Sequence, residues 1–163
     1  MTTKKKTILM IIVAVLIPLL VGGLSAILTS DQMNVYETLK RPPLAPPGWL
    51  FPIAWTILYV LMGLASYFVF SANVASNEKR SALIFYFVQL VMNFFWSIFF
   101  FNYSLYWLSL IWLLVMWILI IICVKRFYKI RKIAGITMIP LLAWTTFAAY
   151  LNLMYCIYSC SLK

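Results

Sequence analysis

Five apolar runs without a charged side chain constrain this chain more than any other feature. The runs extend over residues 8–29, 49–70, 81–101, 105–124 and 133–162. A hydrocarbon core of about 30 Å needs roughly 20 helical residues, and every run supplies that length. Hydrophobic residues make up 66% of the sequence, which a water-soluble domain of 163 residues could not accommodate without large exposed apolar patches. The sequence therefore predicts an all-α integral membrane protein.

The expected architecture is a bundle of five transmembrane helices that forms one domain over residues 1–163. The helices are expected at about 8–29, 49–70, 81–101, 105–124 and 133–160. Asn102, Tyr103 and Ser104 alone separate the third run from the fourth, and a helix through both runs would overshoot a bilayer, so a tight polar turn is expected there. The first run follows Lys4–Lys6 and could instead be a cleaved signal peptide, although its 22 residues exceed a typical signal core.

Basic residues are distributed unevenly between the two sides of such a bundle. Ten of the 13 lysines and arginines lie in the N-terminal segment, between the second and third runs, and between the fourth and fifth runs. The positive-inside rule then places the N-terminus in the cytoplasm and the C-terminus outside, in a membrane that we expect to be the bacterial cytoplasmic membrane. Because these clusters flank helices, the formal charge of +10 indicates contact with membrane lipid headgroups and no nucleic-acid partner.

The residue types required for most membrane chemistry are absent from the five runs. None of the runs contains Asp, Glu, Lys or Arg, and the chain has no His. Ion-coupled transport usually needs ionisable groups inside the membrane, and hydrolysis needs acid–base or metal-ligand sets, so neither is expected. Haem with an axial histidine is excluded. We expect no catalytic residue, no metal and no cofactor, and interpret Cys123, Cys156 and Cys160 as small hydrophobic residues.

One face of the third run carries polar side chains. Gln89, Asn93 and Trp96 recur at helical spacing and Phe100 follows, so two amides and an indole share a stripe. Because amides avoid lipid, this stripe is expected to face protein. The amides either hold helices together, which is the preferred interpretation for Gln89 and Asn152, or contact a ligand, which is an equally good interpretation for Asn93.

A proline-rich connector precedes the second run. The four prolines within residues 42–47 fix φ and remove backbone donors, so we expect a stiff, non-helical segment and interpret residues 30–48 as a loop that caps a pocket. Trp55, Trp96 and Trp144 are too deep or too one-sided for an interfacial belt of tryptophans. They predict an indole-lined cavity that opens outward beneath the loop and takes a flat apolar molecule.

Three sequence motifs, taken together, carry a family resemblance. The first consists of Pro42, Pro46, Pro47, Trp49, Phe51 and Trp55, and residues 89–100 and 140–152 supply the other two. In this order they resemble the translocator protein family, also called tryptophan-rich sensory proteins or the TspO/MBR family. The resemblance implies a five-helix bundle, commonly a homodimer, with a cavity capped by the first loop. It also implies binding of porphyrins such as protoporphyrin IX, and of isoquinoline and benzodiazepine-type drugs.

The resemblance also implies the residues of the ligand pocket, carried over by position. They are Ala26, Tyr36, Pro47, Phe51, Trp55, Asn93, Trp96, Trp107, Trp144, Ala148 and Leu151. The preferred function is a membrane receptor or transport facilitator for porphyrin-like and other flat apolar ligands. The alternative is an enzyme for light-dependent degradation of protoporphyrin IX, which is less favoured because Val35 and Leu44 stand where many relatives place the tryptophans associated with that activity. Leu153 and Ile157 depart from the family's sterol-recognition segment, so cholesterol binding is not expected.

Overall fold

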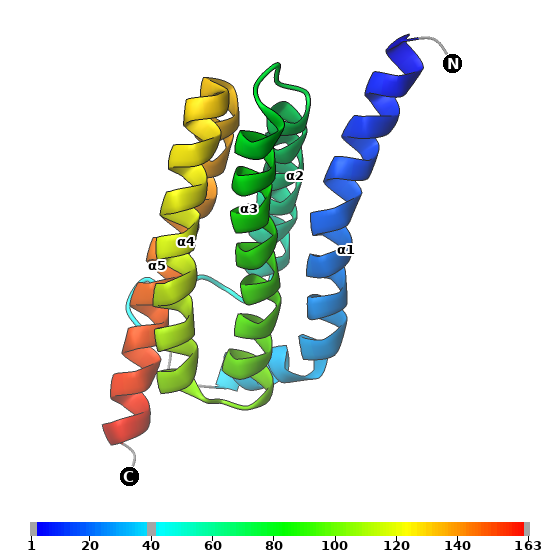
Figure 1. The fold of residues 1–163 in the computed structure, drawn as a ribbon. Helices are drawn as coiled ribbons and strands as arrows, with labels where there is room; N and C mark the ends of the chain where they lie inside the picture. Colours follow the sequence, from blue (N-terminus) through cyan, green and yellow to red (C-terminus); the bar gives the residue numbers. More distant parts are fainter. Residues whose placement is uncertain (1–2, 39–41, 162–163) are drawn as a thin grey trace.

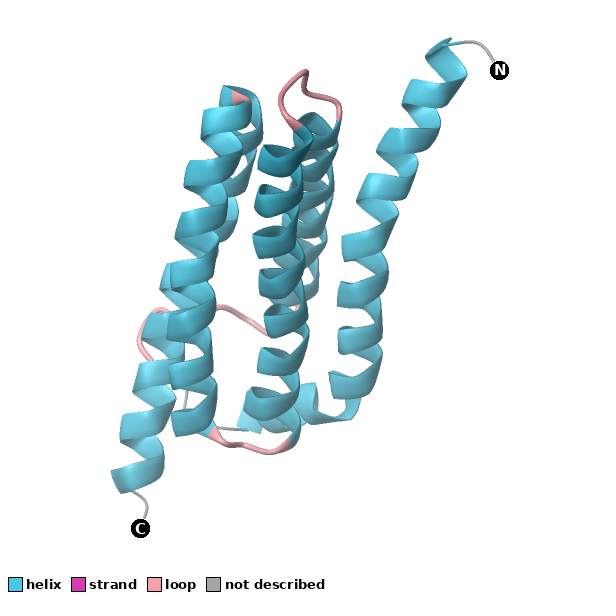
Figure 2. Cartoon of the chain, viewed as in Figure 1, coloured by secondary structure: helices cyan, strands magenta, loops and turns pink. Residues whose placement is uncertain are grey.

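Five long helices and one π-helical turn form the part of the chain that the structure describes. This computed structural model describes residues 3–38 and 42–161, with side chains at residues 4–30 and 42–160. The elements are α1 (Thr3–Thr38), α2 (Leu50–Phe70), α3 (Ser76–Ser97), the π-helical turn η1 (Ile98–Asn102), α4 (Tyr106–Ile130) and α5 (Lys132–Ser161). Five helices are long and apolar enough to cross a membrane, and the described residues contain no strand (Figure 1; Figure 2). The predicted all-α membrane fold is confirmed.

Several helices are longer than the apolar runs that predicted them. α1 continues to Thr38 beyond the expected end at residue 29, α3 begins at Ser76, and α4 continues to Ile130. Polar and charged residues end the membrane-crossing part of a helix but not the helix itself, and residues 30–38 contain neither Pro nor Gly. The expected loop over residues 30–48 therefore begins too early, because residues 30–38 belong to α1. Residues 42–49 are non-helical, as their prolines require.

The helices form a closed ring in the order α1, α2, α5, α4, α3. α2 packs between α1 and α5, α4 packs between α5 and α3, and α1 closes the ring against α3 and η1. α4 and α5 pack most extensively, because only Arg131, in an extended conformation, separates them. α1 diverges from the other helices toward its N-terminus (Figure 1) and buries the smallest share of its apolar span. One wall of the ring is therefore loosely packed.

The connection between α3 and α4 is short, as the polar residues 102–104 predicted. α3 passes into the π-helical turn η1, and α4 starts at Tyr106. Asn102 Nδ2 donates a hydrogen bond of 2.9 Å to the carbonyl of Leu28 on α1. π-Helical turns are rare and occur frequently at functional sites. Here the turn is attached directly to α1.

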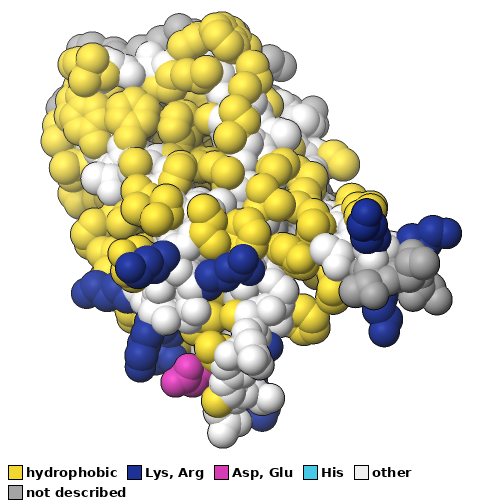
Figure 3. Space-filling view, turned by 90° about the horizontal axis from the view of Figure 1, so that it is seen from above, with side chains coloured by type: hydrophobic (Ala, Val, Ile, Leu, Met, Phe, Trp, Pro, Cys, Tyr) yellow, Lys and Arg dark blue, Asp and Glu magenta, His cyan; other side chains and the backbone are white. Residues whose placement is uncertain are grey.

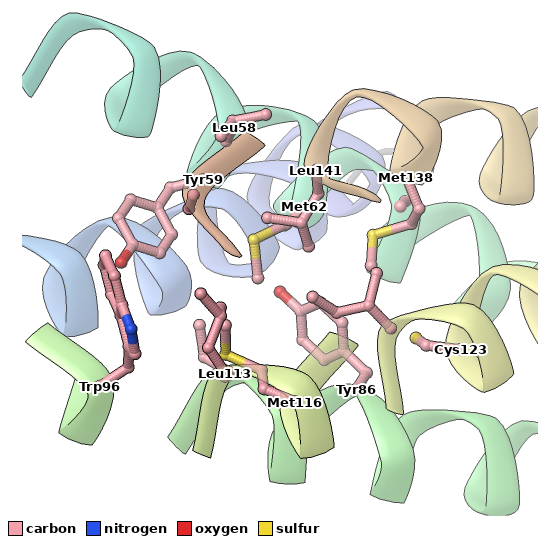
Figure 4. Packing of buried hydrophobic residues seen from close by; sticks show 14 of the residues in the cluster. Leu58, Tyr59, Met62, Tyr86, Trp96, Leu113, Met116, Cys123, Met138 and Leu141 are labelled. Carbon is pink, nitrogen blue, oxygen red and sulfur yellow. The ribbon is translucent and has the colours of Figure 1, made fainter. Parts of the chain in front are cut away.

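Large apolar side chains from α2, α3, α4 and α5 fill the core of the bundle. Met62, Tyr86, Leu113, Met116 and Met138 are at most 1% exposed, and their side chains meet between the helices (Figure 4). Methionine suits such a position because its flexible, polarisable side chain fills irregular space. These four helices form a well-packed unit, and α1 lies against one side of it.

Ten basic residues lie at the end of the bundle that carries the N-terminus. The N-terminus, the α2–α3 connection and the α4–α5 connection are all at this end (Figure 1). Figure 3 looks onto it and shows Lys and Arg side chains gathered beside a large apolar surface. The residues are Lys4, Lys5, Lys6, Lys79, Arg80, Lys125, Arg126, Lys129, Arg131 and Lys132. The grouping of basic residues inferred from the sequence is therefore also a grouping in space.

Candidate ligand-binding site

A cavity among the described residues lies between α1 and α2, beside the end of α3. Its volume is about 400 Å³, within the range of roughly 300–1,000 Å³ that is typical of ligand pockets. The lining surface is mostly apolar. The residues that line it are Leu19, Gly22, Gly23, Ser25, Ala26, Thr29, Ser30, Phe51, Pro52, Trp55, Thr56, Tyr59, Ser97 and Phe101. We take this space as the candidate functional site and name it the α1–α2 cavity.

Small residues form the α1 wall of the cavity. Gly22, Ser25, Ala26 and Thr29 recur at spacings of three and four residues and therefore share one helix face. A Cβ atom on Gly22 would overlap the ring of Tyr59, so only glycine allows this ring to approach α1 so closely. The Thr29 hydroxyl donates a hydrogen bond of 2.9 Å to the Ser25 carbonyl within the same helix. The proton of the Thr29 hydroxyl is therefore used within α1 and is not offered to the cavity.

Aromatic rings form the α2 wall. Trp55 and Tyr59 stack with ring centroids 5.6 Å apart and an interplanar angle of 28°. Phe51 precedes Trp55 by one helical turn, and Phe101 of η1 adds a further ring. Aromatic pairs contribute about 0.5–1.5 kcal/mol beyond the burial of their area. This wall is suited to a flat apolar molecule.

Two residues of α3 support the aromatic wall from behind. The ring centroid of Trp96 lies 6.3 Å from that of Trp55, and the Tyr59 hydroxyl donates a hydrogen bond of 3.1 Å to Asn93 Oδ1. Trp96, Asn93 and Gln89 are all buried, which confirms that the polar stripe of α3 faces protein. Asn93 does not line the α1–α2 cavity and acts on it through Tyr59.

Asn152 of α5 joins three helices in the core beside Trp96. Its Oδ1 accepts hydrogen bonds from Trp96 Nε1 at 3.3 Å and from Ser109 Oγ at 3.1 Å. Its Nδ2 donates to the carbonyl of Tyr106 at 2.9 Å. A buried amide is costly unless both its ends are paired, and this amide is paired at both ends. These bonds agree with the interpretation of Asn152 as a residue that holds helices together.

The predicted pocket residues on α5 lie away from the α1–α2 cavity. Trp144 lines a separate open hollow of about 380 Å³ between α2 and α5. Ala148 and Leu151, together with Phe51 and Trp96, surround a space of about 10 Å³ that neighbouring rings nearly fill. The single cavity expected inside the bundle is therefore divided into separate spaces. Trp144 does not share a cavity with Trp55, because α2 lies between the two hollows.

The remaining predicted residues divide into those that line the cavity and those that do not. Ala26, Phe51 and Trp55 line it. Pro47 and Trp107 are exposed and do not. The side chain of Tyr36 lies outside the described residues. Of the tryptophans predicted for the pocket, only Trp55 lines the α1–α2 cavity among the described residues.

The proline-rich segment lies against α5 and not over the α1–α2 cavity. The Tyr150 hydroxyl donates a hydrogen bond of 3.0 Å to the carbonyl of Pro43, and Ala45 packs against the hydrophobic core. Among the described residues 42–49, none lines the cavity. The expected cap is therefore not provided by this part of the segment.

Sequence reasoning did not select Gly22, Tyr59 or Phe101 as site residues. The sequence does contain an indication for Gly22. The small residues from Gly22 to Thr29 form a stripe, which is unusual in a helix otherwise rich in Leu, Ile and Val. Tyr59 lies one turn after Trp55 and could have been chosen on the same ground. The direction of Phe101 depends on the π-helical turn, for which the sequence offers no recognisable signal.

The ring of five apolar helices defines a helical integral membrane protein, and comparison with known proteins then specifies its family. Residues 14–158 match the TspO/MBR family. The chain is 33% identical over 146 residues to the tryptophan-rich protein TspO of Archaeoglobus fulgidus, covering 89% of this chain and 94% of that protein. It is 33% identical over 117 residues to the tryptophan-rich protein TspO of Chlorobaculum tepidum, covering 72% and 74%. It is 31% identical over 139 residues to the translocator protein of Bos taurus, covering 84% and 82%. The chain belongs to the TspO/MBR family.

Proposed function

We propose that this chain is a membrane receptor or transport facilitator that binds a porphyrin-like or other flat apolar molecule in the α1–α2 cavity. The observation that carries the proposal is the aromatic wall of Phe51, Trp55 and Tyr59 on a cavity of about 400 Å³ within a membrane-spanning bundle. The described residues that line the cavity include no charged side chain, which favours a ligand with an apolar body. The names translocator protein and tryptophan-rich sensory protein, which relatives carry, fit such a role.

The proposal includes an orientation in the membrane. We place the N-terminus in the cytoplasm and the C-terminus outside, in the bacterial cytoplasmic membrane. Support comes from the ten basic residues at one end of the bundle (Figure 3), because such residues accumulate on the cytoplasmic side. The α1–α2 cavity then lies toward the outer leaflet. A homodimer, which the family resemblance implies, stays a prediction.

Titration of the protein in lipid nanodiscs with protoporphyrin IX tests the proposed function. We expect saturable quenching of tryptophan fluorescence in the wild type. Trp55→Ala should weaken the affinity by about tenfold, because a ring face that stacks on the ligand is lost. Trp107→Ala is the matched control, since this tryptophan is 53% exposed and lies off the cavity. Binding that does not saturate, or an equal loss in both variants, would contradict the proposal.

Light-dependent degradation of protoporphyrin IX is the second candidate function. The observation in its favour is the contact of Trp55, in the cavity wall, with Tyr59 beside it and with Trp96 behind it, at centroid distances of 5.6 and 6.3 Å. Illumination of the protein with the porphyrin, followed by absorbance, separates the candidates. A product that forms in the wild type and not in Trp55→Phe would favour the enzyme, and unchanged porphyrin with quenched tryptophan fluorescence would favour the receptor.

A further inference from the structure

The α1–α2 cavity reaches the surface of the molecule on its lateral side. Among the residues that line it, Gly23 and Ala26 of α1 and Pro52 and Thr56 of α2 are exposed, and so is Ser30 at the end of the apolar span of α1. A residue that both lines a cavity and is exposed lies where that cavity opens. We name the part of this opening that is formed by Gly23, Ala26, Pro52 and Thr56 the lateral mouth.

The lateral mouth lies within the membrane-crossing parts of the two helices. The apolar span of α1 ends at Ser30 and that of α2 begins at Leu50. At 1.5 Å per residue, the rim residues lie about 3–10 Å inside these ends. In a hydrocarbon core of about 30 Å this depth corresponds to the acyl chains of one leaflet. The surface nearby is apolar, since Ile27 is 73% exposed and Ile53 is 51% exposed. The mouth therefore faces acyl chains and not water.

Contacts between α1 and η1 narrow the cavity toward the membrane surface at the same end, where Ser30 is its exposed lining residue. Thr29 lines the cavity there and is 5% exposed. Asn102 donates its hydrogen bond of 2.9 Å to the carbonyl of Leu28, which joins the two elements next to Phe101. The last turns of α1 then bend beneath the bundle (Figure 1). A molecule that came from water would have to pass these contacts, whereas one dissolved among acyl chains would not.

α1 is the wall of the cavity that is best suited to move. It crosses α2 where Gly63 has no side chain, and a Cβ atom there would lie 2.5 Å from the Cα of Val15. α1 approaches α2 closely a second time at Gly22, which lies against the ring of Tyr59. Contacts made through glycine bury little side-chain area, and α1 buries the smallest share of its apolar span. Displacing α1 therefore costs less free energy than displacing α2, which packs on both sides.

We propose, on the basis of the proposed function, that the ligand enters and leaves sideways from the acyl chains through the lateral mouth, with α1 as the moving wall. The route requires a ligand that dissolves in the bilayer, so it selects flat molecules with a largely apolar body. A barrier on the route governs the rates of binding and release together, whereas the bound state governs the affinity. Measurements of the association and release rates therefore test whether the ligand uses the lateral mouth.

The experiment places a bulky side chain in the lateral mouth. Gly23→Phe is suited to this because no atom lies within 4 Å of a Cβ built at Gly23. Phosphatidylcholine vesicles loaded with protoporphyrin IX are mixed with vesicles containing the protein, and quenching reports binding; release is followed with empty acceptor vesicles. We expect both rate constants to fall by about tenfold, and Kd to change by less than either rate constant. Thr56→Phe should act in the same way from the opposite wall, and Ile27→Phe, on the exposed face of α1 off the cavity, should leave both rates unchanged.

The outcomes separate this proposal from the proposed function. Wild-type rates in both Gly23→Phe and Thr56→Phe would overturn the lateral route while saturable binding still stands. A weaker affinity with an unchanged association rate would also overturn it, because the added ring would then act on the bound state and not on the barrier. If the wild type does not bind saturably, both proposals fall. Because Gly23 and Thr56 lie on different helices, misfolding of one variant leaves the other to decide.

Discussion

The two sides of α2 pack by different means. On the side of α5 and α4, large side chains interlock and Asn152 joins three helices through paired hydrogen bonds. The space beside Trp96 and Leu151 is only about 10 Å³, and the hollow of about 380 Å³ at Trp144 is open. On the side of α1, the helices approach through Gly22 and Gly63, and a cavity of about 400 Å³ is left between them.

The difference shows how this bundle combines a stable core with a binding space. Trp96 of α3 and Ser109 of α4 both hydrogen-bond to Asn152 of α5, so these helices cannot separate without leaving those polar groups unpaired. The Thr29 hydroxyl on α1 is bonded within its own helix, so it does not depend on α2. α1 can therefore border a cavity without a large loss of hydrogen bonding.

The largest effect is expected from filling the backbone contact between α1 and α2. Gly63→Leu would place side-chain atoms where the backbone of Val15 lies, and this contact cannot yield without displacing the helix. We expect the free energy of unfolding to fall by about 3 kcal/mol, which is at the upper end of the effects of overpacking. We also expect ligand binding to be lost, because the displaced α1 no longer forms a wall of the cavity. Thermal unfolding in detergent and titration with protoporphyrin IX measure the two effects. Ile57→Leu, at an exposed site of the same helix, should change neither.

Wild-type stability in Gly63→Leu would show that α1 is free to dock elsewhere on α2. The close approach of the α1 and α2 backbones would then not be what holds α1 in place. The contrast between the two sides of α2 would no longer stand.

The second effect concerns the opposite side of α2. Asn152→Leu removes both acceptors and donors of the amide and leaves the indole N–H of Trp96 and the hydroxyl of Ser109 without this partner. We expect a loss of about 2 kcal/mol in the free energy of unfolding, with ligand affinity nearly unchanged because Asn152 does not line the α1–α2 cavity. Ser109→Ala removes one bond and should cost about 1 kcal/mol. A loss of affinity at normal stability would instead place Asn152 in the ligand site.

The smallest effect comes from a matched pair of adjacent glycines. In Gly22→Ala the new methyl group overlaps the ring of Tyr59, which must rotate and give up its hydrogen bond to Asn93, so we expect a loss of about 1 kcal/mol in stability and a weaker affinity. Gly23→Ala meets no atom within 4 Å and should be neutral or stabilising by up to about 1 kcal/mol, because alanine favours helix. Thermal unfolding and porphyrin titration of both variants give the comparison. Equal behaviour of the two would show that Tyr59 does not depend on a close approach to α1.

The fold was largely predictable because it depends on properties that accumulate along the chain. The charge-free runs located the membrane-crossing helices, and the prolines of residues 42–47 located a non-helical segment. The helix ends were less well predicted. α1 continues to Thr38 because charge and polarity mark the membrane boundary, while helix formation continues until a residue such as proline stops it.

The site was predicted only in part. The burial of Gln89, Asn93 and Trp96 followed correctly from their spacing, and Ala26, Phe51 and Trp55 line the cavity as expected. Trp144 was placed in the same pocket because it is deep in the membrane, and depth does not specify which side of α2 a side chain occupies. The structure puts it in a different hollow.

The sequence by itself determined that the chain crosses the membrane in apolar helices, that these carry no ionisable group, and which family it resembles. All of these follow from residue types and their spacing. Only the tertiary structure decided where empty space remains, how it is divided between the two sides of α2, and which of the lining residues are exposed. The physical reason is that a cavity forms where side chains of separate helices do not meet, and that depends on helix order and backbone approach, which no single helix encodes.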